Sequence, residues 1–254
     1  MNKTKIEWVR NPDGSQGYSW NPITGCLNGC EYCYARKLAN TRLKERYLAN
    51  KNVAPYKDER DYMNNRHNPF YPRFWEDRMS CQFSYNRSRK PQGIFACDMS
   101  DLFGIGIPEN WTRSVINLIQ AYPQHRFYLL TKQPQNLIKW SPFPDNCWVG
   151  VSATGFREMG RALYVGLERI KAKVKYLSFE PLLEDVNVMP EDFTNTGINW
   201  VIIGAQTKPY KPPKIEWVDE IISACDKASI SVFLKEPLAS HYNIQRQEFP
   251  RGEK

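Results

Sequence analysis

The chain has 254 residues, of which 41% are hydrophobic and 13% are aromatic. This length and composition exclude a disordered chain and predict a single domain over residues 1–254 with a sizeable core. No run approaches 18 consecutive apolar residues, which excludes a membrane span. Residues 1–10 are charged and lack the apolar stretch of a signal peptide. We therefore expect a cytoplasmic protein with no membrane partner.

The net charge of +8 is unevenly distributed along the chain. Residues 1–92 contain 17 Lys and Arg against 9 Asp and Glu, whereas residues 93–254 contain 18 of each. Such an asymmetry favours a polyanionic partner or substrate near the first third of the chain. A solvated basic surface explains the same counts, and charge alone does not separate the two.

The first chemical motif in chain order is a loop with three cysteines, Cys26, Cys30 and Cys33, spaced Cys-x3-Cys-x2-Cys. Gly25 and Gly29 allow this loop to curl so that three sulfurs face one small object. The odd total of seven cysteines, without an export signal, argues against a disulfide framework. Three thiolates can bind three irons of a 4Fe-4S cluster and leave the fourth iron open to a ligand.

Other uses of the cysteines stay open at this point. A structural zinc site needs a fourth ligand, for which Cys81 or His67 is available. A disulfide with one spare thiol is the other alternative. Cys97, Cys147 and Cys225 lie in apolar runs or on a helix, which predicts core positions. Cys97 ends a predicted strand beside the candidate site, so it is also a candidate hydrogen-atom donor, and other catalytic residues stay unknown.

After the loop, residues 34–48 have good helix formers with the spacing of a helix. Residues 50–92 form a Tyr- and Arg-rich insertion after the first βα unit. Arginines interleaved with aromatic residues can meet phosphates and stack on bases, which makes Arg73, Trp75, Arg87 and Arg89 candidate nucleic-acid contacts. An aromatic mini-core with solvated arginines is the alternative.

Beyond residue 92, short apolar runs alternate with helical stretches. The runs are 93–97, 126–130, 147–151, 174–179, 200–204 and 231–234, and helical spacing occurs at 111–119, 163–170 and 217–225. Continuously apolar strands separated by helices are typical of parallel sheets covered on both faces. We therefore predict an α/β fold, a partial or complete TIM-like (β/α) barrel of about six to seven parallel strands.

Polar residues follow each of these predicted strands. They are Asp98, Ser100, Asp101, Thr131, Lys132, Ser152, Glu180, Gln206, Thr207, Lys235 and Glu236. Each of them alone is explained by a helix cap or a turn. In a barrel of parallel strands all of these ends meet on one face, where such enzymes place their chemistry.

The cysteine spacing, with the aromatic Tyr32 before the last cysteine, resembles the signature of radical S-adenosylmethionine (SAM) enzymes, a superfamily that includes spore photoproduct lyase. More closely, the chain is similar to a phage-associated, radical-SAM-like three-Cys-motif family of unknown function. The matching segments are residues 5–8, 20–26, 30–35, 99–103, 123–125, 130–132, 149–152, 177–183 and 200–204.

The resemblance implies a radical SAM type of barrel in which Cys26, Cys30 and Cys33 bind a 4Fe-4S cluster and SAM binds its open iron. Reductive cleavage of SAM then gives a 5′-deoxyadenosyl radical that takes hydrogen from an unidentified substrate, with a nucleic acid or nucleotide as the candidate class. The SAM-binding candidates are Tyr32, Asp98, Ser100, Asp101, Lys132, Ser152 and Glu180. A flavodoxin- or ferredoxin-type electron donor is the expected partner.

Two rival functions remain. A non-catalytic iron–sulfur protein that binds or senses nucleic acid predicts a cluster without turnover of SAM. A structural zinc site predicts zinc without iron. The sequence does not identify the substrate or a protein partner.

Overall fold

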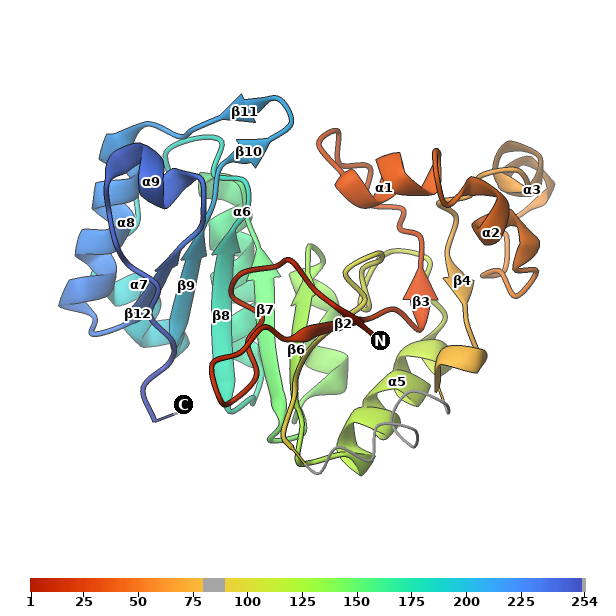
Figure 1. The fold of residues 1–254 in the computed structure, drawn as a ribbon, viewed down its shortest axis with the longest axis horizontal. Helices are drawn as coiled ribbons and strands as arrows, with labels where there is room; N and C mark the ends of the chain where they lie inside the picture. The colour runs from red at the N-terminus through yellow and green to blue at the C-terminus, as the bar shows by residue number, and fades with distance from the viewer. Residues whose placement is uncertain (80–89, 253–254) are drawn as a thin grey trace.

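The computed structural model describes residues 1–79 and 90–252 (Figure 1). Its main feature is an eight-stranded sheet in the order β1-β2-β5-β6-β7-β8-β9-β12. The strands are β1 (Asn2–Lys3), β2 (Tyr18–Trp20), β5 (Gly93–Ala96), β6 (Arg126–Thr131), β7 (Cys147–Ser152), β8 (Val174–Phe179), β9 (Trp200–Ile203) and β12 (Ser231–Leu234). All neighbours from β2 to β12 pair in parallel, and only β1 is antiparallel to its neighbour.

The predicted fold class is confirmed. Each of the six apolar runs is a strand, and β2 is the seventh parallel strand. Within the described residues β1 and β12 lie at opposite ends of the sheet, so the barrel is partial. No helix in the described part of the chain combines the length and hydropathy that crossing a bilayer requires.

Helices α5 (Glu109–Ala121) and α8 (Ile215–Lys227) confirm two of the predicted helices. Each buries one apolar face, that of α5 including Trp111, Val115 and Ile119. The helix predicted at 163–170 is different: α6 (Phe156–Gly160) runs into a wide π-type turn and a short 3₁₀ turn that ends at Arg169. Helix α7 (Pro190–Thr196) links β8 to β9.

The single helix predicted for residues 34–48 is wrong, because the structure has two, α1 (Tyr34–Ala39) and α2 (Lys44–Ala49). The break follows from side chains that bond back to the first helix. Asn40 Nδ2 donates to Arg36 O at 2.8 Å, and Thr41 Oγ1 donates to Lys37 O at 2.8 Å. These short polar side chains compete with further helical hydrogen bonds.

The described part of the insertion contains α3 (Glu59–Asn65) and β4 (Arg73–Phe74). Strand β4 pairs antiparallel with β3 (Ile23–Thr24), immediately before the cysteine loop. Tyr56 stacks on Tyr71 with ring centroids 4.7 Å apart. The insertion therefore has an aromatic mini-core and packs directly against the loop.

An aromatic cluster fills the inner face of the curved sheet. It is contributed by every parallel strand from β5 to β12 and contains Phe95, Tyr128, Trp148, Tyr176, Trp200 and Phe233. Trp8 enters it from the N-terminal segment, which crosses in front of the sheet in Figure 1. Its ring lies 5.2 Å from Phe95 and 5.9 Å from Trp200, and only 1% of the residue is exposed.

Replacing Trp8 by alanine removes this ring from the aromatic cluster. The cavity left among large rings should lower the free energy of unfolding by about 3–5 kcal/mol. Urea denaturation followed by circular dichroism measures the change. Trp140→Ala, which removes a partly buried indole outside this cluster, should cost much less, and equal losses for the two variants would contradict a structural role specific to Trp8.

Candidate functional site

The cysteine loop is fixed to the sheet at its first residue. Gly25 has a φ of +87°, and its N–H donates to Met99 O at 2.9 Å. A Cβ atom at this position would lie 2.5 Å from Tyr71 O and 2.7 Å from Phe70 O. Both the backbone conformation and the close approach of the insertion therefore require glycine.

The three thiols of the loop are half-buried and free of disulfides. Cys26 Sγ accepts the N–H of Asn28 at 3.4 Å, and Cys33 Sγ accepts the N–H of Arg36 at 3.3 Å at the start of α1. Burial, then the charge of Asp101, raises the pKa of Cys26 to about 12, with smaller effects from Cys30 and Cys33. The three sulfurs thus lie within electrostatic range of one another.

This donor set fits an iron–sulfur cluster. The loop offers three soft thiolate ligands, the type that such clusters use. Among the described residues no three Cys, His, Asp or Glu side chains are already placed to hold one metal ion. Binding a cluster therefore requires the loop to draw its sulfurs together. Gly29, between the first two cysteines, has a φ of +79°, a conformation that glycine adopts without strain.

A buried carboxylate ties the loop to the sheet. Asp101 is 5% exposed and accepts hydrogen bonds from Asn28 Nδ2 at 2.8 Å and from Thr131 Oγ1 at 2.7 Å. It also accepts the N–H groups of Lys132 at 2.9 Å and Phe103 at 3.1 Å. Burial raises the pKa of Asp101, and these hydrogen bonds oppose the rise.

Asn28, between the first two cysteines, is held from two sides. Its amide nitrogen donates to Asp101, and its amide oxygen accepts from Gln133 Nε2 at 2.8 Å. Both partners follow strands of the sheet, β5 for Asp101 and β6 for Gln133. This places the loop over the C-terminal edge, by which we mean the edge of the sheet where the parallel strands end.

Asp98 and Ser100 also contact this part of the chain. The carboxylate of Asp98 accepts from Asn21 Nδ2, and its backbone oxygen accepts the hydroxyl of Tyr34 at 2.8 Å. Ser100 Oγ donates to Gly25 O at 2.5 Å. Burial raises the pKa of Asp98. The structure therefore brings together the predicted residues 98–101 and the cysteine loop.

Two buried polar atoms at the C-terminal edge have no hydrogen-bond partner within the described residues, Lys132 Nζ after β6 and Ser178 Oγ on β8. The Nζ atom lies 5.5 Å from the centroid of the Tyr32 ring. Ser152, on the strand between them, pairs in register with Ser178 and is 7% exposed. Because buried polar groups are normally satisfied, these two atoms require a hydrogen-bond partner that the described residues do not supply.

The sequence analysis did not name Ser178 as a candidate site residue. The pattern that could have indicated it is a serine near the end of an otherwise apolar strand, and in the sheet it pairs with the candidate Ser152.

Glu180 is bound to the protein through both carboxylate oxygens. Trp8 Nε1 donates to one at 2.7 Å, and Lys235 Nζ forms an ion pair with the other at 2.8 Å. Burial lowers the pKa of Lys235, but the charge and hydrogen bond of Glu180 outweigh it and leave the pKa raised. A Cβ at Gly204 would lie 3.3 Å from both Glu180 Cγ and Lys235 Cδ. This pair packs against glycine at the end of β9.

The candidate nucleic-acid contacts are placed differently from our expectation. Arg73 is 2% exposed, and its guanidinium donates to four backbone carbonyls, those of Asn50, Asn68, Pro69 and Tyr71. This is a correction: Arg73 holds the insertion together and offers no surface to a phosphate. Trp75 is partly buried, with its indole donating to Thr24 and stacked under Arg78 at 3.9 Å. Arg87 and Arg89 lie outside the described residues.

The remaining described cysteines are core residues. Cys147 and Cys225 are fully buried, and Cys97 is 3% exposed with a φ of +65°. Burial raises the pKa of Cys97 to about 12. Cys97 therefore borders the candidate site through its backbone, one residue before Asp98, and its thiol sits in the core cluster.

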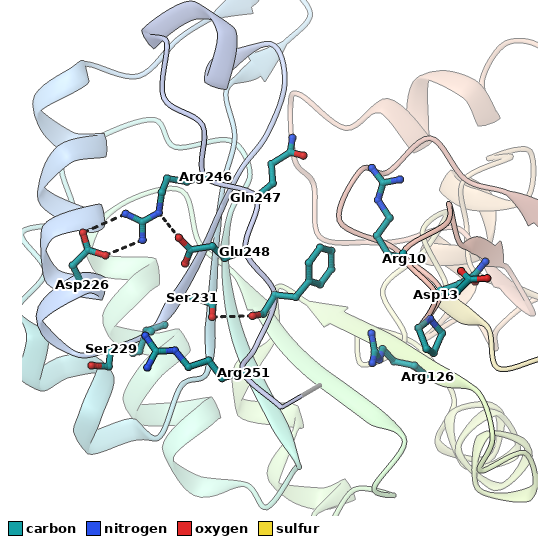
Figure 2. A pocket seen from close by; sticks show the side chains of 15 residues that line it. Arg10, Asp13, Arg126, Asp226, Ser229, Ser231, Arg246, Gln247, Glu248 and Arg251 are labelled. Atoms are coloured by element: carbon teal, nitrogen blue, oxygen red, sulfur yellow. Dashed lines mark hydrogen bonds and ion pairs between the residues drawn. The ribbon is translucent and has the colours of Figure 1, made fainter. Parts of the chain in front are cut away.

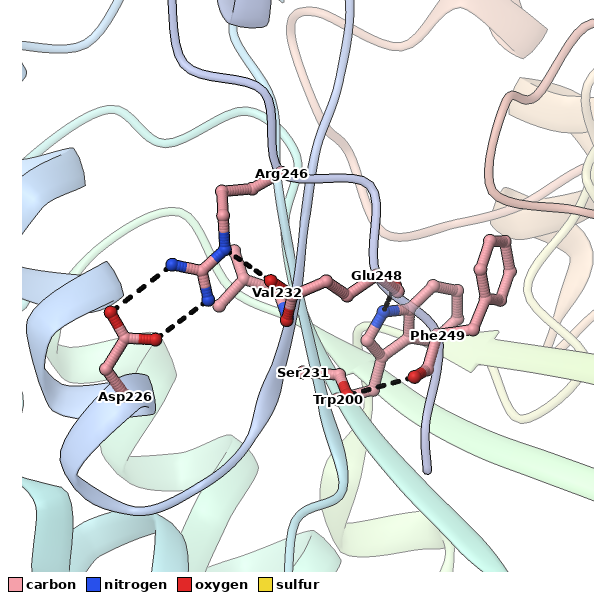
Figure 3. A network of polar contacts seen from close by, with 7 residues as sticks. All are labelled: Trp200, Asp226, Ser231, Val232, Arg246, Glu248 and Phe249. Carbon is pink, nitrogen blue, oxygen red and sulfur yellow. Dashed lines mark hydrogen bonds and ion pairs between the residues drawn. The ribbon is translucent and has the colours of Figure 1, made fainter. Parts of the chain in front are cut away.

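A cavity of about 750 Å³ lies at the other edge of the sheet, between residues 10–14 and the C-terminal residues 246–251 (Figure 2). Arg246 in its wall is neutralised by ion pairs with Asp226 and Glu248, and Trp200 donates to Glu248 O (Figure 3). Ser231, the first residue of β12, also lines it. No predicted site residue does, so this cavity is separate from the candidate site.

Comparison with known proteins agrees with this geometry. The sequence model of a family described as "Protein of unknown function (DUF5131)" matches residues 3–248. The chain belongs to this family. A search of curated proteins finds no match. The prediction that the chain belongs to a family of unknown function is confirmed.

A solved structure, "Spore photoproduct lyase complexed with dinucleoside spore photoproduct", is similar to this chain in fold. The TM-score is 0.53 at 11% sequence identity, over 84% of this chain and 75% of the other. At this identity the likeness shows the fold alone: a partial barrel with a mainly parallel sheet, like that of this lyase.

The raised pKa of Cys26 predicts that its thiol reacts slowly with alkylating reagents. In cluster-free protein, alkylation of Cys26 by iodoacetamide should keep rising with pH up to about 11, because the thiolate forms only as the pH approaches the raised pKa. At pH 8 it should be slower by about 10³ than in urea-unfolded protein. Mass spectrometry of the labelled peptides measures both rates, and a plateau near pH 9 in the folded protein would contradict the prediction.

The two hydrogen bonds that hold Asn28 predict an effect of this residue on iron retention. Asn28→Ala removes the hydrogen bonds to Asp101 and Gln133. In protein reconstituted with iron and sulfide, this variant should therefore lose iron to a chelator several-fold faster than the wild type. The cost in stability should stay at about 1–2 kcal/mol. Asn40→Ala, which removes an exposed hydrogen bond to Arg36, is the control. Iron loss that is the same in both variants and the wild type would show that Asn28 does not position the loop.

Proposed function

We propose that this DUF5131 protein is a radical SAM enzyme that binds a 4Fe-4S cluster through Cys26, Cys30 and Cys33. The observation that carries the proposal is the position of the three-thiol loop, over the edge where the parallel strands end and beside Lys132 Nζ, a buried atom without a hydrogen-bond partner among the described residues. Ser178 Oγ, a second such atom, lies near the end of β8. A fold similar to that of a radical SAM lyase supports the proposal.

When bound, the cluster would supply the electron that cleaves SAM to a 5′-deoxyadenosyl radical for hydrogen abstraction from the substrate. The residues of the chain position and shield this chemistry. Asp101 and Gln133 hold Asn28 and so orient the loop between its first two cysteines. The aromatic cluster around Trp8 fills the inner face below the site and keeps water away from that side.

The buried polar atoms at the strand ends are the proposed contacts of SAM. Lys132 offers an ammonium group to a carboxylate, and Ser152 and Ser178 offer hydroxyls to a ribose or carboxylate. Tyr32, next to Lys132, has a ring for an adenine. Asp98 and Ser100 lie against the loop where an amino group would bind. Asp101, whose oxygens are already satisfied, holds the loop in this place.

We propose a nucleic acid or nucleotide as the class of substrate, because the structurally similar lyase was solved with a dinucleoside photoproduct. A small flavodoxin- or ferredoxin-type protein is the proposed electron donor, because the chain offers a single three-cysteine motif and no second one for electron storage.

The test is anaerobic reconstitution with iron and sulfide, reduction, and addition of SAM. We expect about four irons per chain and formation of 5′-deoxyadenosine measured by chromatography. Cys30→Ser and Cys33→Ser should each lose the product, because each removes one of three ligands. Cys225→Ala, which changes a fully buried thiol remote from the loop, should keep both iron and product.

Other outcomes separate the rival functions. An intact cluster without 5′-deoxyadenosine under several reductants would favour an iron–sulfur protein that binds or senses nucleic acid. Zinc without iron after purification would favour a structural zinc site. Either result contradicts the proposed activity.

A further inference from the structure

A small hairpin extends beyond the C-terminal edge of the sheet. Strands β10 (Gln206–Thr207) and β11 (Tyr210–Lys211) form an antiparallel pair directly after β9, and Figure 1 shows them beyond the end of that strand. All residues from 207 to 211 are exposed. The chain thus presents a short hairpin at the edge where the cysteine loop lies.

The hairpin is basic. Residues 205–214 contain Lys208, Lys211 and Lys214 and no acidic residue. Lys214 lies 5.3 Å above the ring of Trp217. Within the described residues neither Lys208 nor Lys211 takes part in an ion pair, so both charges face solvent.

Aromatic side chains accompany these lysines. Tyr210 is 40% exposed, and its ring lies 5.8 Å from that of the exposed His241. The base of the hairpin is anchored to α9 (Leu238–Tyr242), because the hydroxyl of Tyr242 donates to Pro213 O. Burial and the charge of Glu236 raise the pKa of Tyr210.

A second basic surface lies on the other side of the same edge. Helices α1 and α2 follow the last cysteine, and Figure 1 shows α1 and the hairpin at the same end of the sheet, on opposite sides. Residues 34–49 contain Arg36, Lys37, Arg42, Lys44 and Arg46 with one acidic residue, Glu45. Tyr34, directly after Cys33, is 51% exposed.

We propose that these two surfaces bind the substrate as single-stranded nucleic acid, with phosphates on the lysines of the hairpin and unpaired bases on Tyr210. The inference rests on the proposed function, since it assigns the substrate class of that site. Basic residues combined with exposed rings are what single strands require, because every base has a face that stacks and every linkage carries a charge. Tyrosine is also common at protein interfaces, so an acidic protein is the competing ligand, and binding of polyglutamate separates the two.

The test is binding of fluorescently labelled single-stranded DNA and RNA of about 12 nucleotides to the cluster-loaded protein, followed by anisotropy from 50 to 300 mM salt. Lys208→Ala with Lys211→Ala should lower the salt slope by about 1.4, given roughly 0.7 per lost phosphate contact on a single strand. Tyr210→Ala should weaken binding roughly tenfold, and Tyr210→Phe should keep it. The DNA and RNA arms identify which polymer is preferred.

The matched control is Lys171→Ala with Lys227→Ala, which removes the same charge from exposed positions next to the opposite ends of the strands. It should leave binding within about twofold, since it removes no proposed contact. Equal losses for both double variants, absence of binding by the wild type at 50 mM salt, or equal binding of polyglutamate would overturn the inference. Formation of 5′-deoxyadenosine is measured in parallel without nucleic acid, so that its failure counts against the proposed activity and leaves the binding result to decide the inference.

Discussion

The buried carboxylate of Asp101 is the interaction on which the candidate site depends. It joins three segments that are distant in sequence: the cysteine loop through Asn28, the end of β6 through Thr131 and Lys132, and its own turn after β5. A carboxylate this buried is costly unless its oxygens are satisfied, and four donors satisfy it. The loop is therefore held over the strand ends by a carboxylate whose hydrogen bonds cannot be lost without a large cost in free energy.

The inner face of the sheet divides by polarity. Trp8 and the large rings from β5 to β12 fill the side where the strands begin, whereas Ser152, Ser178 and the Glu180–Lys235 pair lie where they end. The rings supply the packing that a partial barrel lacks at its open side. The polar end contains the proposed ligand contacts, and the basic hairpin and α1 lie beside it. The residues that stabilise the fold and those proposed to bind a ligand therefore lie at opposite ends of the strands.

Much of the fold was predictable because buried parallel strands are continuously apolar, and six such runs became six strands. Strand β2 was not selected, since Tyr-Ser-Trp is short and mixed in polarity. Local sequence patterns also do not reveal contacts between segments that are distant in the chain. The four carbonyls around Arg73 come together only when the insertion folds, and the Asn28–Asp101 contact spans 73 residues. The apolar runs located the ends of six strands, but they could not show which side chains there were already satisfied.

The hydrogen bond from the Trp8 indole to Glu180 has a consequence for the N-terminal segment. The same side chain fills the aromatic interior and donates a hydrogen bond to a carboxylate at the polar end. Removing residues 1–10 would therefore open the aromatic cluster and leave one oxygen of Glu180 without its donor, with Lys235 as its remaining partner. Residues 1–10 are thereby an internal component of the partial barrel, and they connect its core to the ends of the strands.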